Sequence, residues 1–165
     1  MGVLFITALI ITADQISKSL VKSTMTLYDV IPVIPGFFQL NYITNKGMAF
    51  GINLPVSISF FSGISLIITC FLVWILWCER KNNLLMRISL ASILGGAIGN
   101  LIDRIMSCIP NSSYTGVVDF IDIRWGVHKW YIFNIADSAV TVGIILMLFY
   151  SFLFKPKVQP THSIV

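Results

Sequence analysis

Long apolar runs separated by polar segments dominate the chain. Four of these runs are about 20 residues or longer, at about 2–21, 56–77, 84–106 and 131–154. At about 1.5 Å per residue, a helix of this length crosses a hydrocarbon core of roughly 30 Å. The pattern predicts four transmembrane helices joined by polar segments, the longest at about 22–55 and 107–130. We expect residues 1–155 to form a single membrane-embedded domain and residues 156–165 to form a tail.

Composition supports an integral membrane protein. Hydrophobic residues make up 56% of the chain and charged residues 11%, whereas soluble domains carry roughly 25% charged residues. The net charge of +4 comes from scattered basic residues that form no basic face, so we expect no nucleic-acid partner. The three cysteines are odd in number and contain no CxxC pair, so they predict no disulfide framework.

The basic residues give the chain an expected orientation. The short segment between the second and third runs carries Arg80 and Lys81, with Arg87 just beyond it, and the C-terminal tail carries Lys155 and Lys157. The positive-inside rule places these regions in the cytoplasm, and four spans then place both termini there. The first run lacks a basic start and a small-residue cleavage site, so we expect an uncleaved helix rather than a signal peptide.

The acidic residues gather at one expected depth. Six of the seven are Asp, and all six fall in outer segments or at outer ends of spans. An ionised carboxylate inside a span costs roughly 2.5–3.5 kcal/mol, so Asp137, at the opening of the fourth span, is expected to have a function. Asp119 lies in the segment that leads into that span. We therefore expect Asp119 and Asp137 to meet near the outer membrane surface.

Helical spacing brings further polar residues toward this depth. Asn100, Asp103 and Arg104 stand at i, i+3 and i+4, so they share one face of the third span. Asn134 precedes Asp137 by three positions near the start of the fourth span. A buried Asp beside an Arg is often structural, so we expect Asp103 and Arg104 to serve structure and positioning.

Two other spacings concern a pair within the first span and the packing of the third span. Asp14 and Lys18 stand at i and i+4 and can pair, again in a structural or positioning role. Gly95-x-x-x-Gly99 is a small-residue pattern that lets helix backbones approach closely. It is expected to bring the polar face of the third span near another helix.

The outer segments are expected to form a small sheet and a lid on the membrane. Apolar and polar residues alternate over 38–42, which indicates a strand, and residues 45–51 indicate a turn. Trp125, Trp130 and Tyr131 are suited to an interfacial aromatic belt. Asp122 lies close to Arg124 and is expected to be solvated or paired.

The sequence contains few of the residues that several classes of hydrolase require. Metal hydrolysis requires clustered ligands, but His128 and His162 are the only histidines. The GxSxG turn of many serine hydrolases is absent, and Cys108 and His128 have no motif around them. A serine–lysine dyad stays open on residue types, although no distinctive serine accompanies an outer lysine.

Two aspartates remain, and they need neither a metal nor a cofactor. Carboxyl groups held close together share a single proton, because both cannot ionise easily. The charged member takes a proton from water, and the neutral member donates first to the scissile carbonyl and then to the leaving amine. The same acids are also compatible with a proton- or ion-coupled transporter or a non-catalytic scaffold. Charges confined to one leaflet leave a transporter without a polar route to the other side.

Five motifs, in the same order, resemble lipoprotein signal peptidase, also called signal peptidase II. They are Asp14-Gln15 with Lys18, Asn45-Lys46-Gly47-Met48-Ala49-Phe50-Gly51, Gly99-Asn100-Leu101-Ile102-Asp103-Arg104, Val117-Val118-Asp119-Phe120 and Phe133-Asn134-Ile135-Ala136-Asp137. The resemblance covers nearly the whole chain. It implies an all-α membrane protein with four transmembrane helices, a small extracytoplasmic β-cradle and a short amphipathic helix. Residues 105–116 make a longer connection than this family leads us to expect.

The resemblance also implies an activity. It implies an aspartic endopeptidase of the bacterial cell inner membrane, with its active site on the extracytoplasmic side. Its substrates are diacylglyceryl-modified prolipoproteins, cut just before the lipidated lipobox cysteine, and globomycin-type cyclic peptides inhibit it. We expect a monomer in contact with membrane lipids. The family's catalytic pair maps onto Asp119 and Asp137, and its supporting residues map onto Asp14, Lys18, Asn45, Gly47, Asn100, Asp103, Arg104 and Asn134.

Overall fold

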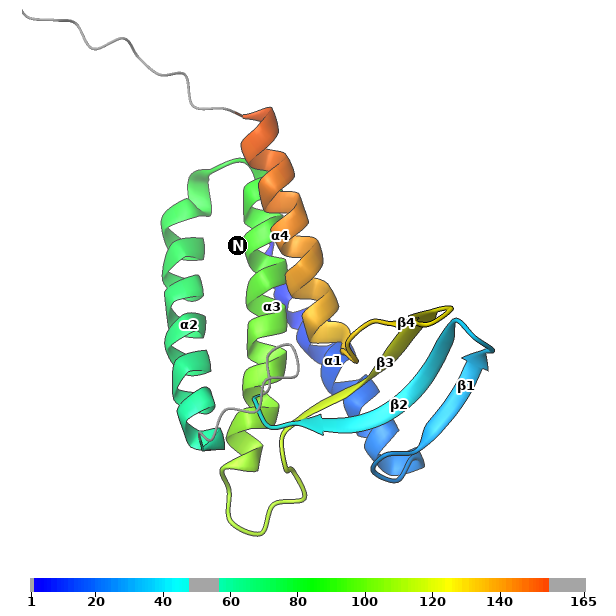
Figure 1. The fold of residues 1–165 in the computed structure, drawn as a ribbon. Helices are drawn as coiled ribbons and strands as arrows, with labels where there is room; N and C mark the ends of the chain where they lie inside the picture. Colours follow the sequence, from blue (N-terminus) through cyan, green and yellow to red (C-terminus); the bar gives the residue numbers. More distant parts are fainter. Residues whose placement is uncertain (1, 48–56, 155–165) are drawn as a thin grey trace, which may run out of the picture.

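Four long helices form the body of the protein (Figure 1). The structure is a computed structural model that describes residues 2–47 and 57–154. The helices are α1 (Leu4–Thr24), α2 (Ile58–Cys78), α3 (Leu84–Ser107) and α4 (Ile135–Leu153), and a 3-10 helix, η1 (Glu79–Lys81), links α2 to α3. All four are long and apolar enough to cross a membrane, which confirms the four predicted spans.

The fourth helix begins later than the expected position 131. The backbone of Phe133 pairs with Ile121 in an antiparallel bridge, so it is not available to a helix. Asn134 has an extended backbone and is the N-cap of α4. Its side-chain oxygen accepts from the Asp137 N–H at 2.9 Å, and the Asp137 carboxylate accepts from the Asn134 N–H at 3.2 Å. This capping box fixes where the helix begins.

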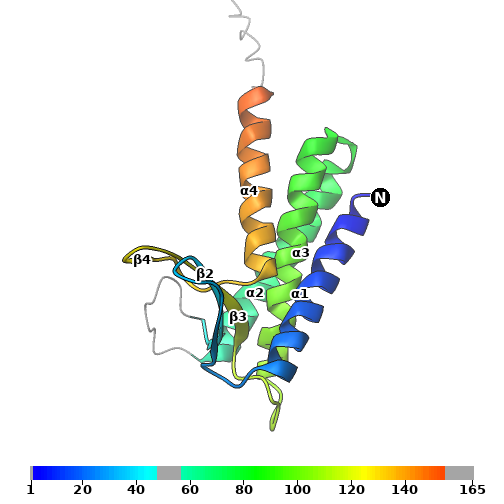
Figure 2. The same cartoon turned by 90° about the vertical axis from the view of Figure 1, so that its right-hand side faces the viewer.

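Helix α3 is the central helix of the bundle. It is the most buried of the four, and α1, α2 and α4 all pack against it (Figures 1 and 2). A Cβ at Gly95 would lie 3.0 Å from Ile10 of α1, and one at Gly96 would meet the Ala136 carbonyl of α4. A Cβ at Gly99 would lie 2.7 Å from the Asp14 carboxylate. These glycines therefore allow the close helix contacts that the Gly95-x-x-x-Gly99 pattern predicts.

A small antiparallel sheet projects from the side of the bundle (Figure 2). Its strands, in spatial order, are β1 (Val30–Ile34), β2 (Phe38–Asn45), β3 (Val117–Trp125) and β4 (His128–Lys129). Strand β2 contains the alternating stretch 38–42. Val118 and Phe120 of β3 are buried in a cluster with Val21 and Met25 of the α1 end and Tyr42 of β2. This cluster anchors β3 beside the start of α4.

The chain has a clear polarity along the bundle. The start of α1, η1 and the end of α4 lie at one end, and the sheet lies toward the other (Figure 1). The short amphipathic helix implied by the resemblance is not among the helices of residues 2–47 and 57–154, and it stays a prediction. The later part of the 45–51 motif and the expected tail at 156–165 fall outside the described residues.

The longer connection between α3 and β3 packs against the end of α1. The Lys22 Nζ atom lies 3.1 Å from the centroid of the Tyr114 ring and 3.3 Å from the Ser113 hydroxyl. Gly116 then brings the start of β3 against Asn45, because a Cβ there would lie 2.7 Å from the Asn45 carbonyl oxygen. The extra residues thus leave β3 in close contact with β2.

Candidate active site

Four polar side chains meet where α3, α4 and β3 converge, and we call them the aspartate–asparagine cluster: Asn100, Asp119, Asn134 and Asp137. The Asn134 amide donates to the Asp119 carboxylate at 2.6 Å and to the Asn100 oxygen at 3.0 Å. Asn100 in turn donates to the Asp137 carboxylate at 2.8 Å. Asn134 also holds Asp137 through the capping box. One asparagine therefore contacts both carboxylates.

Asp119 has an environment that favours its neutral form. Its side chain is only 2% exposed. Burial, reinforced by the negative charge of Asp137, raises the pKa of Asp119 to about 7. Hydrogen bonds from Asn134 and Asn45 and the charge of Lys18 act in the opposite direction but do not overcome burial. Near neutral pH this carboxyl group can therefore either hold a proton or release it.

A second group, which we call the ion-pair cluster, consists of Asp14, Lys18 and Asp103. The Lys18 ammonium lies 2.8 Å from the Asp14 carboxylate and 3.0 Å from the Asp103 carboxylate, and all three side chains are almost fully buried. The predicted pairing of Asp14 with Lys18 is confirmed. Asp103 pairs with Lys18 rather than with its neighbour Arg104, because the face of α3 that carries Asp103 packs against α1.

The ion-pair cluster holds the backbone next to each of the other two aspartates. The Asp14 carboxylate accepts from the Ala136 N–H at 2.9 Å, and Ala136 immediately precedes Asp137. The Asp103 carboxylate accepts from the Val118 N–H at 3.0 Å, one residue before Asp119. Lys18 also donates to the Asn100 oxygen at 2.9 Å. Asp14 thus positions the first turn of α4, and Asp103 positions β3.

Gln15 belongs to this arrangement, although it was not among the expected site residues. Its side-chain amide lies 3.1 Å from the Asp14 carboxylate, 3.2 Å from the Asp103 carboxylate and 3.1 Å from the Gly99 carbonyl. Its position next to Asp14 in an otherwise apolar span is a sequence signal that would have identified it. Gln15 therefore links α1 to α3 through the same two carboxylates that hold the Lys18 ammonium.

Three further expected residues line the approach to Asp119. Asn45 hydrogen-bonds to the Asp119 side chain and accepts from the Gly47 N–H at 3.0 Å. Gly47 has a φ of +112°, and a Cβ there would clash with the Phe61 ring, so glycine is required. Arg104 is close enough to interact electrostatically with both Asp119 and Asp137. Its guanidinium makes no hydrogen bond within residues 2–47 and 57–154.

Asp122 lies apart from both clusters, on the sheet. It is ion-paired with Arg124 at 3.0 Å and Lys129 at 3.7 Å, and it accepts from Gln39 at 2.7 Å and Asn41 at 3.1 Å. Burial acts to raise the pKa of Asp122, but these partners outweigh it and keep the pKa below its usual value. Asp122 is therefore a structural pair, as expected, and is buried rather than solvated.

The described part of the chain offers no metal site built from three or more His, Cys, Asp or Glu side chains. The aspartate–asparagine cluster offers two carboxylates, one of them able to carry a proton near neutral pH, beside the Arg104 guanidinium, which makes no hydrogen bond to the described residues. Such a set can activate water and protonate a leaving group without an electrophilic metal.

Comparisons with known proteins find relatives that match most of the chain. A family model described as Signal peptidase (SPase) II matches residues 6–153. The chain is 40% identical over 147 residues to a lipoprotein signal peptidase of Syntrophotalea carbinolica, covering 88% of this chain and 87% of that one. It is 41% identical over 154 residues to one of Listeria monocytogenes serotype 4a, covering 93% and 95%.

Solved structures show the same fold. One, described as a bacterial membrane enzyme solved by the in meso method at 2.3 Å resolution, has a TM-score of 0.79 and 32% identity, covering 96% of this chain and 92% of that one. Another of the same description, at 1.9 Å resolution, has a TM-score of 0.75 and 34% identity, covering 94% of both. By sequence and by structure, the chain belongs to the signal peptidase II family.

Proposed function

We propose that the chain is an aspartic endopeptidase in which Asp119 and Asp137 cut diacylglyceryl-modified prolipoproteins just before the lipidated lipobox cysteine. Membership of the signal peptidase II family makes it a peptidase that removes signal peptides from prolipoproteins. The observation that supports the two aspartates as the catalytic pair is their shared partner. Asn134 donates to Asp119 from its side chain and to Asp137 from its backbone.

The reaction requires the pair to hold one proton between them. The ionised carboxylate takes a proton from water as the water oxygen bonds to the scissile carbonyl carbon. The neutral carboxyl donates a hydrogen bond to the carbonyl oxygen, and a proton reaches the cysteine nitrogen as the carbon–nitrogen bond breaks. Because the carboxyls titrate as a coupled pair, the roles of base and acid belong to the pair rather than to separate residues.

Arg104 and the asparagines are proposed to hold the peptide. The Arg104 guanidinium is not engaged by the described residues and stands near both carboxylates. A peptide carbonyl is a suitable acceptor for it, because Arg presents several N–H donors in a fixed plane. Asn45 and Asn100 already contact the carboxylates and would restrain the same segment.

The position of Asp137 suits a substrate that lies in the bilayer. Asp137 is in the first turn of α4, at the junction between a membrane span and the sheet. The lipobox likewise joins a membrane-embedded signal helix to a mature chain outside it. Apolar helix surface near this junction can hold the acyl chains, at roughly 0.8 kcal/mol per buried CH₂. The same site is proposed to bind globomycin-type peptides.

The proposed location is the bacterial cell inner membrane, with the site on the extracytoplasmic side and both termini in the cytoplasm. The start of α1, the end of α4 and the basic segment around η1 lie at one end of the bundle, and β3 and the start of α4, which carry the two aspartates, lie toward the other (Figure 1). Basic residues next to spans favour the cytoplasmic side.

The test is cleavage of a purified diacylglyceryl-modified prolipoprotein by the detergent-solubilised protein. Asp119→Asn and Asp137→Asn are each expected to lower the cleavage rate by at least about 10³-fold, because each removes a proton-transfer group. Mass spectrometry of the product is expected to place the cut immediately before the modified cysteine. A substrate without diacylglycerol is expected to be cut poorly.

Asp29→Asn is the matched control, since Asp29 is exposed in an outer turn and its side chain accepts from the Thr26 N–H at 2.8 Å. This variant is expected to cleave at the wild-type rate. Wild-type turnover by a correctly folded Asp119→Asn or Asp137→Asn protein would remove that residue from the pair. A cut elsewhere in the substrate would disprove the proposed specificity while leaving the chain a peptidase.

A further inference from the structure

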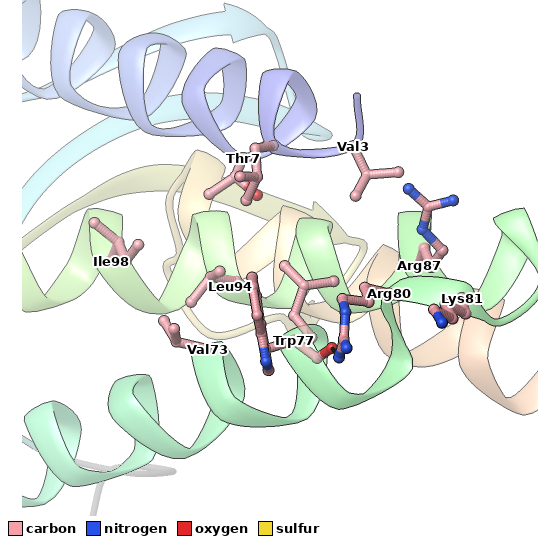
Figure 3. A pocket seen from close by; sticks show the side chains of 11 residues that line it. Val3, Thr7, Val73, Trp77, Arg80, Lys81, Arg87, Leu94 and Ile98 are labelled. Atoms are coloured by element: carbon pink, nitrogen blue, oxygen red, sulfur yellow. Dashed lines mark hydrogen bonds between the residues drawn. The ribbon is translucent and has the colours of Figure 1, made fainter. Parts of the chain in front are cut away.

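A cavity of about 680 Å³ lies between α1, α2 and α3, at the end of the bundle that carries η1 (Figure 3). Its η1 end is far along the bundle from the aspartate–asparagine cluster, and its other end reaches Ile98, two positions before Asn100 on α3. Helices α1 and α2 both pack on α3, and the cavity occupies the space that these packings leave between α1 and α2. The proposed peptidase activity does not use this cavity.

The cavity has one basic end and a long apolar remainder. Arg80, Lys81 and Arg87 lie at one end, with Arg87 on the side of Val3 and Arg80 on the side of Trp77, whereas Val73 and Ile98 line the other (Figure 3). Its remaining lining is almost entirely apolar: Val3, Leu4, Leu76, Trp77 and Leu94, with Thr7. The one hydroxyl among these, on Thr7, already donates to the Ala91 carbonyl at 2.9 Å. A ligand that fits this lining has an anionic head and an apolar body.

The three cations at the basic end have no acidic partner within residues 2–47 and 57–154. The Nε–H of Arg87 is buried and makes no hydrogen bond in the same part of the chain. Arg80 donates to the Trp77 carbonyl at 2.8 Å and lies 4.6 Å from that indole ring. A buried donor left without an acceptor is costly, so an anion between Arg87 and Arg80 would supply what is missing.

The length of the cavity matches one membrane leaflet. Ile98 lies about 16 Å beyond Arg87 along α3, at about 1.5 Å per residue. Half of a hydrocarbon core of roughly 30 Å is about 15 Å. We propose that the cavity binds one anionic phospholipid, with its phosphate on Arg80, Lys81 and Arg87 and an acyl chain along Leu94 and Ile98.

The apolar lining favours a lipid over a free anion. Inorganic phosphate would satisfy Arg87 but would leave the apolar remainder of the cavity unfilled. The rim residues Leu4, Val73 and Trp77 are 44%, 50% and 56% exposed and lie on membrane-spanning helices. A lipid acyl chain in the cavity would therefore be continuous with the surrounding bilayer, and a lipid molecule could enter from the bilayer between α1 and α2.

The test uses dioctanoyl phosphatidylglycerol added to the full chain in a non-ionic detergent, with binding followed by native mass spectrometry and by the thermal unfolding midpoint. Wild-type protein is expected to bind one lipid molecule and to unfold at a higher temperature. Arg87→Gln is expected to weaken binding about fivefold, because one cation near the headgroup is removed. Arg87→Lys, which keeps the charge, is expected to restore part of the binding.

Lys129→Gln is the matched control, since it removes one positive charge on the sheet, away from the cavity, and is expected to bind like the wild type. Dioctanoyl phosphatidylcholine, which has the same chains without a net charge, is expected to bind more weakly. Inorganic phosphate at equal concentration is expected to give no stabilisation. Equal binding of the two lipids, equal binding by wild type and Arg87→Gln, no lipid binding, or stabilisation by phosphate alone would each overturn the proposal.

Discussion

The carboxylates of the ion-pair cluster and those of the aspartate–asparagine cluster differ in their partners. Asp14 and Asp103 share the ammonium of Lys18 and accept backbone N–H groups. Asp119 and Asp137 instead accept from neutral side-chain amides and a backbone N–H. Four buried or partly buried aspartates within one bundle thus occupy two kinds of environment.

This difference teaches how one residue type can serve both structure and chemistry. A buried cation stabilises an ionised carboxylate, so it favours a permanently charged structural group. A neutral amide donates a hydrogen bond without supplying charge, and a second carboxylate nearby then makes it easier for the pair to keep a proton. The ion-pair cluster is suited to holding β3 and α4 in place, and the aspartate–asparagine cluster is suited to exchanging a proton.

The largest expected effect on stability comes from removing the shared cation. Lys18→Met leaves Asp14 and Asp103 buried without their partner, and it is expected to lower the free energy of unfolding by about 3–5 kcal/mol. Unfolding in detergent with added denaturant measures the change. Lys22→Met removes a more exposed ammonium on the same helix and is expected to cost less than about 1 kcal/mol. Equal losses in the two variants would contradict a structural role for the ion-pair cluster.

The next effect is a dependence of stability on pH that belongs to Asp119. With a pKa of about 7 when folded and about 4 when unfolded, this group holds its proton longer in the native state. Its contribution to the free energy of unfolding is on the order of a few kcal/mol. This contribution is fully present below about pH 4 and is lost as the pH rises through about 7. The difference in unfolding midpoint between wild type and Asp119→Asn, measured across this range, isolates it. A difference that does not change with pH would show that Asp119 has an ordinary pKa.

Asn134 connects the capping of α4 with the chemistry of Asp119, and two variants separate these roles. Asn134→Ala removes the cap and is expected to cost about 1–2 kcal/mol of stability, whereas Asn134→Ser keeps a capping oxygen and recovers most of it. Both variants lose the side-chain amide that donates to Asp119. In the wild type this hydrogen bond lowers the pKa of Asp119, so its loss raises that pKa. In both, the loss of activity at alkaline pH is therefore expected at a higher pH. An unshifted pH–activity profile in Asn134→Ser would show that the Asn134 amide does not control the pKa of Asp119.

The smallest expected effect is at Gln15. Its amide donates to both carboxylates of the ion-pair cluster, but Lys18 already compensates their charges. Gln15→Ala is expected to cost about 1 kcal/mol of stability, and to lower cleavage only a few-fold. A loss as large as that of Lys18→Met would mean that hydrogen bonding, rather than charge, holds the cluster together.

The four spans, and the positions of Asp119 and Asp137 beside the fourth one, could be predicted because each sequence signal is local. A long apolar run can be recognised as a membrane span without knowing which helices pack against it. An acidic residue at the edge of such a run carries a free-energy cost of insertion whatever the rest of the fold. The five ordered motifs supplied the family, which is that of a peptidase and not of a transporter or scaffold. The supporting residues Asn100 and Asn134 followed from the motifs and from helical spacing.

Features that depend on packing could not be predicted. The start of α4 was misplaced because Phe133 pairs with Ile121, a contact between segments that become neighbours only in the fold. The ion pair of Asp103 could not be predicted for the same reason, since its partner Lys18 reaches it from another helix. The cavity beside Arg87 depends on the spacing of α1 and α2 around α3, which no local pattern encodes.

The most direct test of the central claim, that Asp119 and Asp137 share one proton, is an infrared titration of the aspartate carboxyls in ¹³C-aspartate-labelled protein. Between about pH 5 and about pH 9, the wild type is expected to lose one protonated carboxyl band with a midpoint near 7. This band is expected to be absent from Asp119→Asn and unchanged in Asp29→Asn. A band that persists unchanged in both Asp119→Asn and Asp137→Asn, or no protonated carboxyl at about pH 5, would contradict the shared proton.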